Sequence, residues 1–526
     1  MMIAASPLTL AERQKWTNDF GSHLDERLRW LITYVREHRQ KPAYLKPYGD
    51  SLITLIKQAS SFPSLAQPVV NLILTLHPLP ERWGYWTAWD EVLQAGAAIA
   101  ARHAWHAPQA ELLAHRAHLL WSCSRYEEAV PVGRQALQIA ETAAAVLPLG
   151  VAGGALARSL SALRPVDEAR ELLADLLKKV AVLRPRANRA DYATAMLSLE
   201  HSQALLFRQQ GQPDKAIAVA QRMLQRVEGK SHASPYQLGD TYVELATMLW
   251  AGGDYHPAVH ALQTAIRLFE HVEDTVAAIF ARGNLGLVYW SMARYDLAEQ
   301  GMRHCAAFCE QHNIRWRLIS EVGNLAVVYL GQGKLQPALR HAHRHFDLAR
   351  RYGHSHELSR ARLNRGAIHV YLRQYEPARQ DLEESLERVT REGRQELIAA
   401  VSIDLTLCYA GLGQLKLARR FAHSAYAMAQ EMAFPGLTII ALRALAQVGE
   451  PDQRVSHLQK ALSLARQHHR LLDEAGCLFS LAALAEDKDK QAAYWQQAKR
   501  LLQKMGATAW LNQHTPNNPP FLALML

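Results

Sequence analysis

Residues 284–298 have the sequence NLGLVYWSMARYDLA, and they contain the pattern that decides the fold. Gly286 is followed three positions later by Tyr289, and a turn sequence then leads to Ala298. Gly286 and Tyr289 are separated by about 60° on a helical wheel, so they share one helix face. A small residue lets a second helix approach closely, and the aromatic ring fills the space beside it. The stretch therefore predicts two packed helices joined by a tight turn.

The same pattern recurs along the chain at a nearly constant step. The alanine of the second helix occurs at Ala129, Ala169, Ala216, Ala258, Ala298, Ala338, Ala378 and Ala418. Successive alanines are 40 to 47 residues apart, and the last four steps are all 40. Twelve residues before them stand Ala117, Ala157, Ala204, Ala246, Gly286, Ala326, Gly366 and Thr406. A single hairpin cannot bury its apolar face alone, so we expect the units to stack into a solenoid.

This succession of small residue, aromatic residue, turn and alanine resembles the tetratricopeptide repeat over residues 100–430. The step exceeds the family's usual length of about 34 residues, and such longer repeats resemble those of bacterial signal-transduction ATPases of the STAND class. Residues 84–93 (GYWTAWDEVL) are similar to the entry segment of their sensor region, and residues 24–59 resemble the preceding helical layer. Residues 498–506, followed by Trp510, resemble their closing helix. The resemblance implies a right-handed, all-α solenoid with a regulatory, peptide-receiving role.

The ATPase part of such proteins is not expected here. A phosphate-binding loop needs Gly-x4-Gly-Lys-[Ser/Thr]. Residues 229–231 supply Gly-Lys-Ser, but Leu224 stands where the first glycine is needed. Gly333-Lys334 is followed by leucine. We therefore expect a sensor arm without the NTPase domain, and Met1 indicates a complete chain.

Proline and glycine breaks, and the end of the regular step, predict the domain organisation. We expect an N-terminal helical region at 1–80, the solenoid at 81–435, two degenerate hairpins forming a cap at 436–510, and a tail at 511–526. No alternating strand pattern of useful length occurs, so the predicted class is all-α. The apolar residues 521–526 are expected to pack on the last hairpin, with occupation of the groove as the alternative.

Composition narrows the class of protein and its compartment. The 526 residues include 59 Lys+Arg and 49 Asp+Glu, with 49% hydrophobic and 21% charged residues, which excludes a disordered polymer. Five scattered cysteines are too few for a disulfide scaffold and favour a reducing compartment. The N-terminus lacks the features of a signal peptide, and the longest uncharged apolar stretch falls short of about 18 residues. We expect a cytoplasmic protein that does not enter a membrane.

We call the eight alanines listed above the signature alanines. The candidate site is a column of residues, one from each repeat, that stands fourteen residues before each signature alanine. It contains His115, Ala155, Ser202, Glu244, Asn284, Asn324, Asn364 and Asp404. The column points about 160° away from the small packing residue, so we expect it to face the groove of the solenoid. An amide offers donors and an acceptor to the backbone of an extended peptide, and the tetratricopeptide resemblance implies this role for the three asparagines. Glu244 and Asp404 are expected to act as flanking selectors.

Arg360 lies one turn before Asn364 and is expected to contact a ligand carboxylate. The alternative for the asparagines is that each one caps or bonds a neighbouring repeat. Trp121, Trp250 and Trp290 stand close to the packing face, so we expect them to pack between repeats rather than to stack on a ligand.

No metal, cofactor or catalytic residue is predicted. Cys305, Cys309 and His312 share a helical face that is suited to zinc, but alanine fills the position of Cys305 in other repeats, which favours a buried thiol. His341, His343 and His345 do not share one helix face. No zinc-protease helix or nucleophile signature occurs, so we do not expect an enzyme.

We therefore predict a non-enzymatic recognition solenoid, a bacterial regulatory or sensor component, that binds a peptide or protein segment in its concave groove. Basic residues are concentrated from Arg340 to Arg365, but acidic residues interleave with them. This pattern favours a solvated face first, an acidic protein partner second and nucleic acid last. Two alternatives remain, a structural adaptor that self-associates into an oligomer and a nucleic-acid-binding solenoid.

Overall fold

The computed structural model describes residues 10–38, 42–123, 125–163, 166–230, 233–352, 355–391, 394–432 and 434–512. Within these ranges every regular element is a helix, and no strand occurs. The prediction of an all-α fold is therefore confirmed. The apolar tail at 521–526 lies outside the described residues.

The chain divides into two compact units. Unit 1 comprises Met1–Leu206, Ala218–Glu244 and Arg267–Ala278, and unit 2 comprises Phe207–Ile217, Leu245–Ile266 and Ile279–Leu526. The first helices, which belong to unit 1, are α1 (Leu10–His38), α2 (Pro42–Leu45), η1 (Lys46–Tyr48), α3 (Gly49–Ala59), η2 (Pro63–Leu65), α4 (Ala66–Leu76), α5 (Leu79–Arg82), α6 (Trp86–Arg102), α7 (His106–Ser122), α8 (Tyr126–Thr142), α9 (Val146–Leu163), α10 (Val166–Leu183) and η3 (Arg184–Arg186).

Five helices contribute residues to both units: α11 (Arg189–Gln209), α12 (Pro213–Val227), α13 (Pro235–Gly252), α14 (Tyr255–His271) and α15 (Thr275–Ser291). The rest of unit 2 consists of α16 (Tyr295–Gln311), α17 (Arg315–Gly331), α18 (Leu335–Arg351), α19 (Ser355–Tyr371), α20 (Tyr375–Arg391), α21 (Gln395–Gly411), α22 (Leu415–Glu431), α23 (Pro435–Val448), α24 (Pro451–Gln467), α25 (Leu471–Leu484), α26 (Lys488–Lys504) and η4 (Thr508–Leu511).

The repeated sequence pattern coincides with the helix boundaries. The second helix of each of the eight hairpins begins three residues before the signature alanine: α8, α10, α12, α14, α16, α18, α20 and α22. All eight signature alanines are at most 1% exposed. The small residues twelve positions earlier are buried as well. The predicted helical hairpins are therefore present with the predicted packing face.

Unit 1 contains the one described helix that is long and apolar enough to cross a membrane, α9. Its apolar residues are accounted for by packing, because 72% of the helix is buried and it contacts α7, α8 and α10. Close approach of α11 contributes to this burial. A Cβ atom added at Gly150 in α9 would lie only 2.4 Å from the Cα atom of Ala195 in α11.

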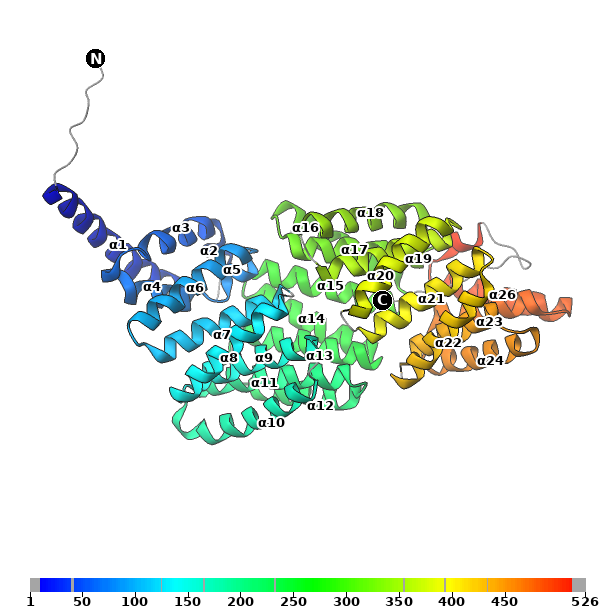
Figure 1. The fold of residues 1–526 in the computed structure, drawn as a ribbon, viewed down its shortest axis with the longest axis horizontal. Coiled ribbons are helices and arrows are strands. Elements are labelled where there is room, and N and C mark those ends of the chain that lie inside the picture. Colours follow the sequence, from blue (N-terminus) through cyan, green and yellow to red (C-terminus); the bar gives the residue numbers. More distant parts are fainter. Residues whose placement is uncertain are drawn as a thin grey trace, which may run out of the picture. The chain divides into compact units, whose positions relative to one another are not determined.

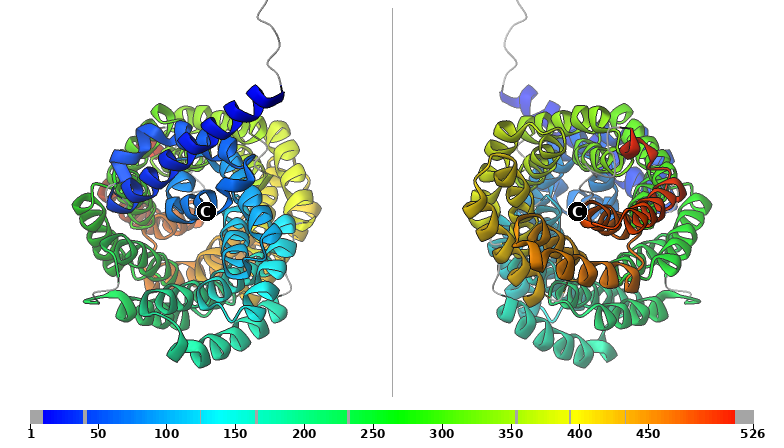
Figure 2. Two further views of the ribbon diagram at one scale, coloured as in Figure 1. Left: turned by 90° about the vertical axis from the view of Figure 1, so that its left-hand side faces the viewer. Right: turned by 90° about the vertical axis from the view of Figure 1, so that its right-hand side faces the viewer.

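In unit 2 the helices from α16 to α26 pack against one another in chain order (Figure 1). Figure 2 shows the same stack from two further sides. The first helices of successive hairpins, α17, α19, α21, α23 and α25, also contact one another directly. They form a continuous layer, and this layer carries the candidate column from Asn324 onward.

The small residues control how closely the two helices of a hairpin approach. A Cβ atom at Gly366 in α19 would lie 2.7 Å from Leu382 Cγ in α20. A Cβ atom at Gly286 in α15 would lie 3.0 Å from Met302 Cγ in α16. Both distances are shorter than a normal carbon–carbon contact. A residue larger than glycine at either position would therefore require the neighbouring side chain in the second helix to move.

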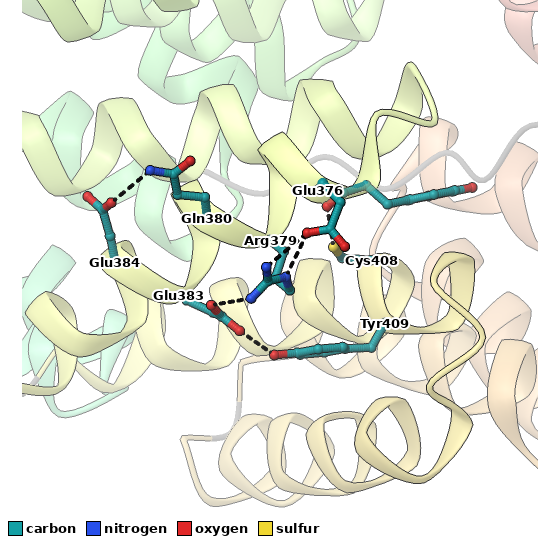
Figure 3. A network of polar contacts seen from close by, with 8 residues as sticks. Glu376, Arg379, Gln380, Glu383, Glu384, Cys408 and Tyr409 are labelled. Carbon is teal, nitrogen blue, oxygen red and sulfur yellow. Dashed lines mark hydrogen bonds and ion pairs between the residues drawn. The ribbon is translucent and has the colours of Figure 1, made fainter.

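Hydrogen bonds connect each repeat to the one before it. Tyr409 in α21 donates its hydroxyl to Glu383 Oε1 in α20 at 2.5 Å, and Arg379 pairs with the same carboxylate and with Glu376 (Figure 3). Tyr329 in α17 donates in the same way to Glu299 in α16 at 3.0 Å. In these two repeats the aromatic residue thus fills space and also attaches the first helix to the preceding second helix.

The C-terminal end of unit 2 packs back onto turns of much earlier repeats. Trp510 in η4 is 3% exposed and donates its indole N–H to the carbonyl of Gly331, 179 residues earlier, at 3.1 Å. Its ring stands edge-on to Tyr371, with the centroids 5.4 Å apart. Gly333 has φ +78°, and a Cβ atom there would lie 2.6 Å from the backbone nitrogen of Trp510. The glycine is therefore required both by the turn and by the tryptophan.

Neighbouring turns are covered in the same manner. A Cβ atom at Gly211 would lie 3.3 Å from the carbonyl oxygen of Met432, and one at Gly506 would lie 3.6 Å from Asp296 Oδ2. Burial and the charge of Asp473 raise the pKa of Tyr295. The turns inside earlier hairpins thus contact the segments that connect later helices. We call the three contacts Gly211–Met432, Asp296–Gly506 and Gly331–Trp510 the return seam.

Replacing Gly366 by leucine is expected to lower the stability of the fold by about 1–3 kcal/mol, because the larger side chain must displace α20. A lower midpoint in denaturant unfolding, followed by the helical circular dichroism signal, would show this. Gln380→Leu, at an exposed position of α20, is the control and should change stability by less than about 0.5 kcal/mol. Equal midpoints for both variants would contradict the packing described for Gly366.

Replacing Trp510 by alanine is expected to open the turn that it covers. Amide hydrogen exchange of residues 331–334 should become faster, although these amides are bonded inside their own turn. The control is Trp30→Ala, because Trp30 is 62% exposed on α1. Unchanged exchange at 331–334 would show that the return seam does not stabilise that turn.

Candidate ligand-binding site on the first helices

The six predicted site residues all lie on first helices of hairpins. Glu244 lies on α13, Asn284 on α15, Asn324 on α17, Arg360 and Asn364 on α19, and Asp404 on α21. Glu244 belongs to unit 1 and the other five belong to unit 2. Asn324, Asn364 and Asp404 are buried, because α17, α19 and α21 pack directly against one another.

Two of the three asparagines bond an arginine of the following repeat. Arg317 in α17 donates to Asn284 Oδ1 at 2.9 Å and to the carbonyl of Phe280 at 3.2 Å. Arg360 in α19 donates to Asn324 Oδ1 at 3.3 Å and to the carbonyl of Ser320 at 3.2 Å. In each pair the arginine bridges the asparagine and the carbonyl one helical turn before it. Sequence analysis named this kind of inter-repeat bond as the alternative to ligand binding.

Arg360, which was expected to contact a ligand carboxylate, already has a carboxylate inside the protein. Its guanidinium pairs with Glu357 at 3.0 Å. Glu357 also accepts hydrogen bonds from Ser320 at 3.0 Å and from His345 at 2.9 Å. Burial lowers the pKa of His345, even though its bond to Glu357 acts in the opposite direction. His345 is therefore neutral at pH 7 and serves this network rather than a metal ion.

Arg317 has a similar internal partner that sequence analysis did not identify. Its guanidinium pairs at 2.6 Å with Glu321, which is fully buried. The signal in the sequence is the four-residue spacing of Arg317 and Glu321 on one helix face. Asn284 lies 33 residues before Arg317, so the repeat-to-repeat bond is visible only once the hairpins are stacked.

Asn364 and Asp404 differ from the other members of the column. They line one small cavity together with apolar residues of α17 and α19, which are Val327, Leu330, Leu363, Ala367 and Ile368. Asn364 is 9% exposed and Asp404 is 3% exposed. Within the described residues neither side chain has a hydrogen bond or an ion pair. The structure thus brings together two of the predicted site residues and leaves both polar groups without a partner.

Burial has a strong effect on the carboxyl group of Asp404. Because no positive charge or donor offsets its desolvation, burial raises the pKa of Asp404 to about 8. The side chain is therefore largely protonated at neutral pH and becomes a charged carboxylate only when the pH rises or a cation arrives. A group in this state is suited to binding a partner that supplies the missing hydrogen bonds.

Unit 1 contains a second polar group on its first helices, which sequence analysis did not connect. Arg158 in α9 donates to Ser202 Oγ at 2.8 Å and to His118 Nδ1 at 2.9 Å, and its guanidinium lies 4.6 Å above the ring of Trp121. Burial and the nearby charge of Arg158 hold the pKa of His118 well below its usual value. Glu244 lies 3.0 Å from His201 Nε2. The members of this group are partnered by one another, unlike Asn364 and Asp404.

The tryptophans and cysteines occupy packing positions. Trp250 donates to Ser291 Oγ of the next repeat at 2.7 Å, and Trp121 lies beneath Arg158. Cys305 and Cys309 are both 0% exposed. Among the described residues no group of three His, Cys, Asp or Glu side chains is arranged to hold a metal ion.

Comparisons with known proteins agree with this architecture. A family model described as tetratricopeptide repeat matches residues 317–391, and a model described as anaphase-promoting complex subunit 5 matches residues 186–282. A search of curated proteins finds no match to this chain.

Several solved structures are similar to this chain at low sequence identity. A Rap protein complexed with Competence and Sporulation Factor is 14% identical, with a TM-score of 0.53 over 68% of this chain and 98% of the other. A Rap conjugation gene regulator of the plasmid pLS20, in complex with the Phr* peptide, is 13% identical, with a TM-score of 0.49 over 66% and 94%. A STAND protein with a tetratricopeptide repeat sensor from Pyrococcus horikoshii is 14% identical, with a TM-score of 0.45 over 72% and 55%.

The matched model covers α18, α19, α20 and most of α17, and it falls on the hairpins whose step and packing face follow the repeated signature. The Rap structure with the TM-score of 0.53 shares the helical architecture. This chain is therefore a helical repeat protein, and its residues 317–391 match the tetratricopeptide repeat model.

Proposed function

We propose that this chain is a non-enzymatic regulatory protein that binds a peptide or an extended protein segment along the first helices of unit 2. The observation that carries the proposal is the pair formed by Asn364 and Asp404. Both groups are buried in one cavity and have no partner among the described residues. The remaining asparagines of the column in unit 2, Asn284 and Asn324, are bonded by Arg317 and Arg360, so the proposal does not depend on them.

The energetic argument concerns unsatisfied polar groups. A buried donor or acceptor without a partner costs roughly 1–3 kcal/mol, so a ligand that bonds Asn364 and Asp404 would gain free energy of this order. The amide of Asn364 can donate to a ligand carbonyl and accept from a ligand N–H at once. This two-way bonding suits the backbone of an extended chain.

The spacing of the layer suits such a ligand. Adjacent packed helices lie about 8–10 Å apart, and an extended chain rises about 3.3 Å per residue. One repeat therefore corresponds to about three ligand residues. A ligand that reaches from Asn284 to Asp404 crosses four first helices and needs about ten residues.

Two further observations support the regulatory, protein-binding assignment. The Rap protein of similar fold was solved with Competence and Sporulation Factor bound. The internal pairs of Arg317 and Arg360 with glutamates remove the argument for an acidic ligand at these arginines. All five cysteines are free, and four are buried, which fits the reducing cytoplasm that we assign to the protein.

The test is selection of peptides from a displayed library of random twelve-residue sequences on the purified full-length chain. We expect wild type to enrich defined peptides and Asn364→Ala to bind them about fivefold more weakly, because about 1 kcal/mol of hydrogen bonding is lost. The matched control is Gln336→Ala, which removes an exposed amide from the second helix α18.

Equal affinity of wild type and Asn364→Ala for every enriched peptide would move the binding surface away from the first helices. Failure of wild type to enrich any peptide, together with a molecular mass that rises with concentration in light scattering, would favour the self-associating adaptor instead.

A further inference from the structure

The cavity at Asn364 and Asp404 has a composition that selects one kind of ligand group. Its walls come from three successive first helices, α17, α19 and α21. Five of the seven lining residues are apolar, Asn364 is a neutral amide, and Asp404 is the one titratable group in the lining. The cavity volume is about 20 Å³, enough for a group of about the size of one water molecule.

Most ligand groups fit this lining badly. A carboxylate or phosphate would be repelled by Asp404 once that group ionises. A methyl group would fill the space but would leave the carboxyl and the amide without hydrogen bonds. A calcium ion needs six to eight oxygen ligands, and these walls provide only two side chains with oxygen.

An ammonium group satisfies both polar side chains. It is compact, and it carries three donors. One donor can meet the Asp404 carboxylate in a charge-assisted hydrogen bond, and another can meet the carbonyl oxygen of Asn364. A guanidinium is planar and too wide for a space of this volume.

We propose that the cavity lined by Asn364 and Asp404 receives an ammonium group of the bound peptide, either a lysine side chain or the free amino terminus. This inference rests on the proposed function and names the chemical group that the site selects. It places the selectivity in one buried carboxylate rather than in the basic surface of the chain.

The same geometry predicts how binding depends on pH. Burial raises the pKa of Asp404 to about 8, and no other titratable group from α17 or α19 lines the cavity. An ammonium ligand binds the ionised carboxylate, so binding below pH 8 must release the proton of Asp404. Affinity should therefore rise as the pH goes from 6 towards 8, by up to about tenfold per unit. Above pH 8 it should level off for a lysine ammonium and fall for an amino terminus, whose own pKa is about 7.7–8.0.

The experiment uses four pools of synthetic random twelve-residue peptides. The amino terminus is either free or acetylated, and lysine is either included or replaced by norleucine. Capture on the immobilised full-length chain is measured by mass spectrometry at pH 6, 7 and 8. The variant is Asp404→Asn, which keeps the shape of the side chain, and the control is Asp347→Asn, an equal change of charge at an exposed position of α18.

We expect wild type and Asp347→Asn to capture peptides that contain at least one ammonium group, with capture rising from pH 6 to pH 8. Loss restricted to the lysine-free pools assigns the lysine side chain, and loss restricted to the acetylated pools assigns the amino terminus. Asp404→Asn should lose at least tenfold in capture, and the dependence on pH should disappear. It should also be no less stable than wild type at pH 8, because the unfavourable buried carboxylate is gone.

Equal capture of all four pools, or capture by Asp404→Asn that matches wild type, would overturn the ammonium assignment and leave peptide binding intact. Capture of no pool by wild type at any pH would overturn the proposed function and this inference together.

Discussion

The close approach of two helices within each hairpin is the constraint on which the rest of this structure depends. The signature alanines are buried at 0–1% exposure, and at Gly366 the second helix comes so near that a Cβ atom would overlap Leu382. In a solenoid, hydrophobic burial occurs only between neighbouring units. The close packing of the two helices of a hairpin therefore fixes which face of the first helix is covered and which face remains for other contacts. The column of Asn284, Asn324, Asn364 and Asp404 stands on that side.

The members of this column are in two different states, although they occupy equivalent positions. At Asn284 and Asn324 the next repeat supplies an arginine, and each arginine is in turn held by a glutamate. At Asn364 and Asp404 no such arginine is present, and a cavity remains. Arginines of the following repeats thus bond Asn284 and Asn324, whereas Asn364 and Asp404 have no such bond among the described residues.

The helical hairpins could be predicted from the sequence because their signals are local. The turn signature and the small residue stand within twelve positions of each other, and every second helix begins where the signature begins. The candidate column could be predicted to face away from the hairpin partner for the same reason. Its occupancy could not, because Arg317 and Arg360 reach it from the following repeat, 33 and 36 residues away.

Trp510 shows the same limit at longer range. Its resemblance to a closing helix marks it as a C-terminal residue, but no local pattern relates it to Gly331, 179 residues earlier. The unpaired state of Asp404 also depends on the absence of a neighbour, and such an absence leaves no motif in the sequence. Contacts between repeats therefore required the structure, whereas contacts within a repeat did not.

The return seam has a consequence for how the gene of such a protein can change. In an open solenoid, a repeat can be duplicated or deleted at little cost, because each unit recognises only its neighbours. Between Gly331 and Trp510, however, an extra hairpin would shift the closing helix by one repeat and bring Trp510 opposite a turn without the Gly331–Gly333 geometry. The contact between Gly331 and Trp510 therefore fixes the number of hairpins between them, whereas an open solenoid has no contact that depends on its number of repeats.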